Sequence, residues 1–108
     1  MTDRLAAAEA LLADLVGFAS ISGQPNGEIV NYIKTYLESY GVIVHLDSHE
    51  DGQRFNLFAS IGPQIDGGIL LSGHLDVVPA NPAGWSRDPF VLHKQDGRLY
   101  GRGAVDMK

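Results

Sequence analysis

The feature that most constrains this fold is an uninterrupted apolar run followed at once by polar groups. The run is Gly68-Ile69-Leu70-Leu71-Ser72-Gly73, and His74-Leu75-Asp76 comes directly after it. An apolar run of this length, bounded by glycines, predicts a central strand that is buried on both faces. In an extended backbone the side chains of His74 and Asp76 point the same way. We therefore expect a functional site at the end of a buried strand.

Apolar periodicity predicts two helices before this run. Leucines and alanines at helical spacing follow a Thr2/Asp3 cap and predict a helix to about Phe18. Asn26 caps a second amphipathic helix, and Gly41 ends it.

The remaining segments predict strands and turns. A short run rich in β-branched residues favours a strand at Val42–Leu46, and alternation favours one at Arg54–Ile61, besides the run at Gly68–Gly73. Gln95-Asp96-Gly97 predicts a hairpin turn that joins Phe90–His93 to Arg98–Tyr100, because Asp-Gly suits tight hairpin turns. The predicted fold is α/β, with two helices and one small mixed sheet of four or five strands.

Composition excludes several classes of protein. At 108 residues the chain forms one domain at most, and a net charge of −5 with eight Lys and Arg argues against a nucleic-acid partner. No apolar stretch approaches the roughly 20 residues of a membrane span. The N-terminus lacks the pattern of a signal peptide, so we expect a cytoplasmic protein. Because there is no cysteine, any metal site must use His, Asp and Glu.

A histidine and a carboxylate two residues apart are open to two interpretations. His74 is either a structural histidine at a strand end or a metal ligand, and Asp76 alone is compatible with a turn. A metal-bound imidazole commonly donates its second ring N–H to a carboxylate, which is the role that Asp76 would fill. A second carboxylate, Asp106, follows the glycines Gly101 and Gly103. The combination of these features favours a site over a structural histidine.

At this point the chain resembles a known family. Leu70–Pro79, Trp85–Phe90 and Asp96–Lys108 closely resemble the di-zinc amidohydrolases and exopeptidases of the peptidase M20 family, with further likeness at Ser22–Asn26. The resemblance covers the whole chain but only the first quarter to third of such an enzyme. It implies that residues 1–108 are the N-terminal segment of an α/β/α zinc-exopeptidase-like catalytic domain. The rest of that domain and the lid domain are then absent.

The resemblance also assigns roles to three residues. His74 is expected to ligate one metal, Asp106 to bridge two metals, and Asp76 to hold the His74 imidazole. The implied cofactors are two Zn²⁺ or Co²⁺ ions, and the implied substrate is a small N-acylated amino acid. A homodimer is compatible with the full-length enzyme. The peptide bond between Asp106 and Met107 is expected to be cis, as is typical of the family.

The resemblance is incomplete in a way that bears on activity. Enzymes of this family continue with a Glu-Glu pair, a further carboxylate ligand and a distal histidine, all of which would lie beyond Lys108. A catalytic zinc normally takes about three protein ligands, so we expect the chain alone to be inactive. The leading hypothesis is the N-terminal part of an N-acyl amino acid amidohydrolase. The alternatives are a desuccinylase, an aminoacylase or a carboxypeptidase of the same family, or a non-catalytic remnant.

Overall fold

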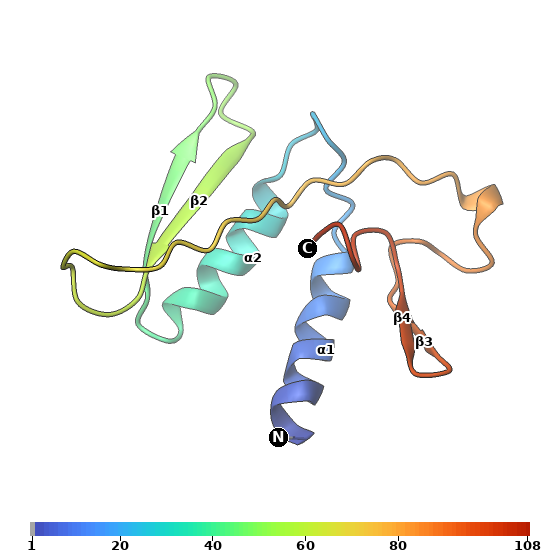
Figure 1. Ribbon diagram of the computed structural model, residues 1–108. Coiled ribbons are helices and arrows are strands. Elements are labelled where there is room, and N and C mark those ends of the chain that lie inside the picture. The colour runs from blue at the N-terminus through green and yellow to red at the C-terminus, as the bar shows by residue number, and fades with distance from the viewer. Residues whose placement is uncertain (1) are drawn as a thin grey trace. The chain divides into compact units, whose positions relative to one another are not determined.

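The computed structural model describes residues 2–108, which divide into two compact units. One unit combines the N-terminal residues through Gly23 with Gly73–Lys108, and the other is Gln24–Ser72. Figure 1 shows the elements in chain order: α1 (Thr2–Val16), α2 (Gly27–Glu38), β1 (Ile43–Ser48), β2 (Phe55–Ser60), the 3₁₀ turn η1 (Pro82–Gly84), β3 (His93–Gln95) and β4 (Arg98–Tyr100).

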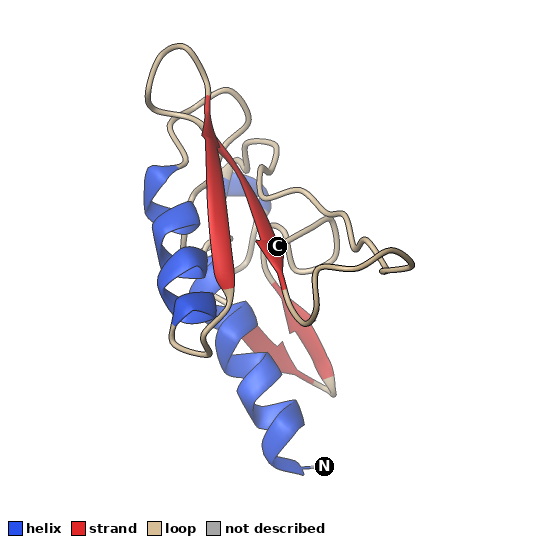
Figure 2. Ribbon diagram, turned by 90° about the vertical axis from the view of Figure 1, so that its left-hand side faces the viewer, coloured by secondary structure: helices blue, strands red, loops and turns tan. Residues whose placement is uncertain are grey.

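The unit Gln24–Ser72 is a hairpin covered by a helix. Strands β1 and β2 pair antiparallel, with Ile43 opposite Ser60 and Ser48 opposite Phe55. Helix α2 contacts both strands, and Figure 2 shows a helix (blue) beside the long strands (red). Ile29 and Val30 of this helix are buried. The predicted helix and both predicted strands are confirmed, and their predicted ends differ from the observed ends by two residues at most.

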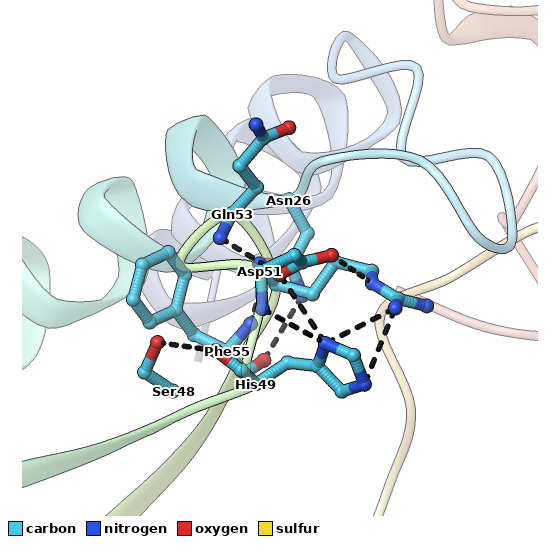
Figure 3. A network of polar contacts seen from close by, with 7 residues as sticks. Asn26, Ser48, His49, Asp51, Gln53 and Phe55 are labelled. Atoms are coloured by element: carbon cyan, nitrogen blue, oxygen red, sulfur yellow. Dashed lines mark hydrogen bonds and ion pairs between the residues drawn. The ribbon is translucent and has the colours of Figure 1, made fainter.

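Asn26 occupies the position predicted for it, but its side chain makes different hydrogen bonds. It is the N-cap residue of α2, yet its side chain makes no capping hydrogen bond. Instead its Nδ2 donates to the carbonyl of Phe55 at 3.0 Å, and the Phe55 N–H donates to Oδ1 at 2.8 Å. Asn26 therefore ties the start of α2 to the start of β2 (Figure 3).

The turn between β1 and β2 is organised around one carboxylate. The backbone N–H groups of Gln53 and Arg54 donate to Asp51 Oδ1 at 2.9 and 3.2 Å, and Arg54 Nε donates to Oδ2 at 2.8 Å (Figure 3). These contacts, the Gln53 N–H first among them, lower the pKa of Asp51 to about 2. The ionised carboxylate of Asp51 thus stabilises the turn between β1 and β2.

The other unit contains α1 and the second hairpin. Strands β3 and β4 pair antiparallel from His93 opposite Tyr100 to Gln95 opposite Arg98. Asp96 and Gly97 have φ angles of 51° and 73°, and a two-residue turn with positive φ at both positions matches the twist of the strands. The predicted turn is confirmed at Asp96 and Gly97 and the strand Arg98–Tyr100 is confirmed, but the predicted strand Phe90–His93 is wrong, because the first strand is His93–Gln95. Phe90 lies instead in a turn in which the Val91 N–H donates to the Asp88 carbonyl.

The predicted strand at Gly68–Gly73 is wrong. The segment forms neither strand nor helix, and the exposed fractions of Ile69, Leu70 and Leu71 are 91%, 75% and 90%. A strand needs a neighbour that pairs with its backbone, and among residues 2–108 β1 pairs only with β2 and β3 only with β4. The single mixed sheet is therefore also corrected to two separate antiparallel hairpins.

No helix in the described part of the chain is long and apolar enough to cross a membrane.

Candidate metal centre

The residues around His74 are held by a segment near the N-terminus. After α1, residues Ser20–Ser22 run parallel to residues 75–77, with a bridge between Ile21 and Val77. The Ser22 N–H donates to the Val77 carbonyl at 3.0 Å, and the Val77 N–H donates to the Ser20 carbonyl at 2.9 Å. The Ser20 hydroxyl also donates to the carbonyl of Leu75 at 2.5 Å. The backbone beside His74 is thus fixed although it belongs to no regular strand.

The imidazole of His74 lies between the two aspartates named from the sequence. Its Nε2 is 2.9 Å from Oδ1 of Asp106, and its Nδ1 is 3.0 Å from the backbone oxygen of Asp76 and 3.2 Å from Oδ1 of the same residue. The side chains of His74, Asp76 and Asp106 are 49%, 57% and 88% exposed. The structure therefore brings the three predicted residues together at the surface of one unit.

The charges in this cluster reinforce one another. The hydrogen bond from His74 to Asp106 raises the pKa of His74, and the contacts with Asp76 add to this effect. The pKa of Asp76 is lowered, first by the hydroxyl of Ser22, which donates to Oδ2 at 2.5 Å, and further by His74. The cluster therefore favours the ionised form of Asp76 beside the imidazole.

Glycines allow the segment that carries Asp106 to approach α1 and residue 77 closely. A Cβ on Gly101 would lie 2.9 Å from Val16 Cγ1, and a Cβ on Gly103 would lie 2.9 Å from Val77 Cγ1. Gly103 also has a φ of 89°, which L-residues rarely adopt. Both glycines of the motif are required by packing, because any side chain would push this segment away from the core of the unit.

Lys108 anchors the end of the same segment. Its ammonium donates to the carbonyl of Phe18 and lies 3.5 Å from that of Val16, at the C-terminal end of α1. Carbonyl groups at a helix C-terminus carry partial negative charge, so a lysine is favourable there. Burial lowers the pKa of Lys108. In Figure 1 the C-terminus correspondingly lies close to the end of α1.

The expected cis peptide bond is wrong. No peptide bond among the described residues is cis, so Asp106 and Met107 are joined in trans. The trans form is favoured by about 3–4 kcal/mol for a residue other than proline.

The cluster fits a metal ion in chemistry but supplies too few ligands. Zinc binds histidine nitrogen and carboxylate oxygen at ~2.0–2.2 Å, so two atoms on one ion lie at most ~4.4 Å apart. The 2.9 Å between His74 Nε2 and Asp106 Oδ1 satisfies this limit. Oxygen atoms of Asp76 are hydrogen-bond partners of Nδ1, so Nε2 is the ring nitrogen that would bind a metal. Among residues 2–108, however, no group of three or more His, Cys, Asp or Glu side chains is arranged to hold a metal ion.

Sequence reasoning missed three residues that build this cluster. Ser20, Ser22 and Lys108 contact segments that are 54 to 92 positions away in the chain. Ser20 and Ser22 lie in a loop rich in Gly, Pro and Ser, where hydroxyl groups usually make local hydrogen bonds. The available signal was the likeness of Ser22–Asn26 to the family, which named no role for the serine.

Known proteins are similar to the part of the chain that contains this cluster. The model of peptidase family M20/M25/M40 matches residues 70–108, the part that contains His74, Asp76 and Asp106. Residues 70–108 belong to peptidase family M20. The predicted family resemblance is thereby confirmed.

Curated M20 relatives extend the similarity over most of the chain. Acetylornithine deacetylase from Proteus mirabilis is 37% identical over 105 residues, 91% of this chain and 27% of the relative. The enzymes of that name from Shigella sonnei and Edwardsiella ictaluri are 41% and 36% identical, covering 79% and 100% of this chain but 22% and 30% of the relatives. The chain therefore spans about a quarter of the length of the curated relatives it matches.

A solved structure shares the fold. The crystal structure of human carnosine dipeptidase 1 matches with a TM-score of 0.77 at 30% identity, over 90% of this chain and 24% of that chain. This likeness confirms the predicted fold class, an α/β domain of the M20 type.

Proposed function

We propose that this chain is the N-terminal segment of a metal-dependent amidohydrolase that removes the acyl group from a small N-acylated amino acid. The observation that carries the proposal is the contact of His74 Nε2 with Asp106 Oδ1, with Asp76 on the opposite ring nitrogen. The most specific form of the proposal is acetylornithine deacetylase, which converts N-acetylornithine and water to ornithine and acetate in arginine biosynthesis. The names of three curated relatives support that form.

The roles follow from the atoms that each residue presents. His74 Nε2 and the Asp106 carboxylate would hold a pair of Zn²⁺ or Co²⁺ ions, with Asp106 as the ligand that both would share. Asp76 accepts the Nδ1–H, which sets the tautomer and makes Nε2 the stronger ligand. Bound metal would supply Lewis acidity for the amide carbonyl. A shared carboxylate between two cations reduces their mutual repulsion, which is the reason to place Asp106 at that position.

The exposed apolar segment supports the proposal that more of the catalytic domain belongs to this protein. Ile69, Leu70 and Leu71 have the composition of a buried strand and are 75–91% exposed in the described residues. We propose that this segment pairs with strands of the remaining catalytic domain, and that the whole enzyme is about the length of its relatives. The whole enzyme is proposed to be cytoplasmic, with no nucleic-acid or membrane partner, and a homodimer is compatible with it.

A dipeptidase is the second candidate, and one observation favours it. The solved structure with a TM-score of 0.77 is named as a dipeptidase, which cleaves a peptide bond rather than an acyl amide. Both reactions attack a linear amide, so the cluster around His74 is compatible with either. Substrate preference separates the two candidates.

The test uses the whole enzyme, expressed from the complete reading frame that contains these residues and loaded with zinc or cobalt. We expect hydrolysis of N-acetylornithine, abolished by a chelator and by His74→Ala. His45→Ala is the matched control, because His45 lies exposed on β1 in the other unit, and it should keep full activity. Faster cleavage of dipeptides than of N-acyl amino acids would show that the enzyme is a dipeptidase and not a deacetylase.

The chain of 108 residues is expected to be inactive in the same assay. It presents two metal ligands where a catalytic zinc needs about three. It also lacks an assigned general base, and base catalysis is typically worth 10²–10⁴-fold. Turnover of N-acetylornithine that follows the purified chain and disappears with chelator would contradict this part of the proposal.

A further inference from the structure

The hydroxyl of Ser22 contacts the carboxylate that holds His74. Ser22 Oγ donates to Asp76 Oδ2 at 2.5 Å, while Asp76 Oδ1 lies 3.2 Å from His74 Nδ1. The two carboxylate oxygens therefore have different partners, a serine on one and the imidazole on the other. Ser22 makes no contact with the proposed metal ligands that the structure describes, so any effect on them passes through Asp76.

An exposed aspartate needs such a partner to keep one orientation. The last torsion of an aspartate side chain is broad and roughly two-fold, so an unrestrained carboxylate samples many planes. Asp76 is 57% exposed, and packing does little to restrict it. A charge-assisted hydrogen bond to one oxygen is short and directional. The Ser22 hydroxyl therefore selects the plane in which Oδ1 faces His74.

The backbone of Ser22 is held independently of its side chain. Its N–H donates to the carbonyl of Val77 at 3.0 Å, and the neighbouring residue Ile21 forms the parallel bridge to Val77. Removing the hydroxyl leaves both of these contacts in place. The position is also exposed, so a smaller side chain opens no cavity in the core. The hydroxyl also lies 3.4 Å from the Val77 carbonyl, but the backbone hydrogen bonds to Val77 do not depend on that longer contact.

We propose that Ser22 is a positioning residue of the metal centre, which orients the Asp76 carboxylate so that His74 keeps its proton on Nδ1 and presents Nε2. The inference rests on the proposed function, because it concerns how the chain's own residues present a ligand. It adds a residue from the N-terminal segment to a site whose other members come from residues 74–106.

The test measures zinc affinity in the whole enzyme by competition with a chelator of known affinity, independently of turnover. Ser22→Ala is expected to weaken zinc binding about tenfold, because loss of a partner behind a metal-bound histidine commonly costs 10–100-fold. Ser22→Thr keeps the hydroxyl and should restore affinity to within about threefold. Ser48→Ala is the matched control, since that hydroxyl contacts the His49 carbonyl in the other unit and not Asp76; it should leave zinc affinity unchanged.

A double variant decides whether Ser22 acts through Asp76. If it does, Ser22→Ala combined with Asp76→Ala binds zinc as Asp76→Ala alone does. Fully multiplicative losses, or an unchanged affinity in Ser22→Ala, would overturn the proposal. Ser22→Cys, whose thiol is a weak donor, provides a second test and should fall between serine and alanine. Zinc binding that survives His74→Ala would instead contradict the proposed function, which keeps the two failures distinguishable.

Discussion

Nε2 of His74 lies 2.9 Å from Oδ1 of Asp106, although the two residues are 32 positions apart. Two separate anchors produce this contact. The serines after α1 hold the backbone next to His74, and Lys108 holds the segment of Asp106 to the end of α1. The N-terminal segment therefore supports both halves of the candidate metal centre, and changes there are expected to affect metal binding.

Asp76→Ala and Asp106→Ala are expected to differ in the whole enzyme. Removing Asp76 frees the His74 ring, so activity should fall 10–100-fold while much of the metal remains. Removing Asp106 deletes a ligand that we propose is shared, so at least one metal should be lost and turnover should be undetectable. Metal analysis and kinetics on both variants test this. Two retained metals with substantial activity in Asp106→Ala would show that Asp106 is not the bridge.

Gly103→Ala should displace the segment that carries Asp106. The new Cβ would meet Val77 Cγ1 at 2.9 Å, and the φ of 89° is strained for alanine by about 1–2 kcal/mol. We expect zinc affinity of the whole enzyme to fall, together with a lower melting temperature. Gly84→Ala is the control, because a Cβ at that position would meet no other atom within 4 Å. Equal zinc affinity in the two variants would argue against a requirement for the close approach.

Asn26→Ala should destabilise the unit formed by α2, β1 and β2. It removes both hydrogen bonds to the backbone of Phe55, and each such loss costs about 0.5–1.5 kcal/mol. Asn26→Asp keeps the acceptor but not the donor, so it should lie between the wild type and the alanine variant. Amide hydrogen exchange measures this effect, and we expect faster exchange in the alanine variant only at residues 26–60. Unchanged exchange there would show that the two bonds contribute little.

The β1–β2 turn should lose stability in acid. The pKa of Asp51 is lowered from 3.8 to about 2 in the fold, so the ionised form is favoured there. Its contribution is present above about pH 4 and is lost as the pH falls through about 2. Melting temperatures of the wild type and of Asp51→Asn, measured from pH 6 to pH 2, should therefore converge in acid. A difference that stays constant over this range would contradict the assignment.

Local patterns in the sequence predicted the elements whose causes are local. The Asp96-Gly97 turn was predictable because both residues tolerate positive φ, and Gly41, with a φ of 74°, follows the end of α2 for the same reason. The three residues of the candidate centre were also identified, because a family resemblance tied His74, Asp76 and Asp106 to one chemistry. None of these inferences needed distant contacts.

The segment at Gly68–Gly73 shows where local patterns fail. Its composition is that of a buried strand, but burial depends on neighbouring strands, and residues 2–108 provide none that pairs with it. A pattern specifies what a segment is suited to, whereas its partners decide whether the strand forms.

The sequence by itself determined the two helices, the strands of the first hairpin and the Asp96-Gly97 turn, because spacing and residue type carry that information. Its family resemblance named His74 and Asp106 as candidate ligands and Asp76 as the partner of the His74 ring. Only the tertiary structure showed that the Ser22 hydroxyl donates to Asp76 and that Lys108 binds the carbonyls at the end of α1. Those contacts join residues 54 and 90 positions apart, and no periodicity or local motif encodes a pairing over such distances.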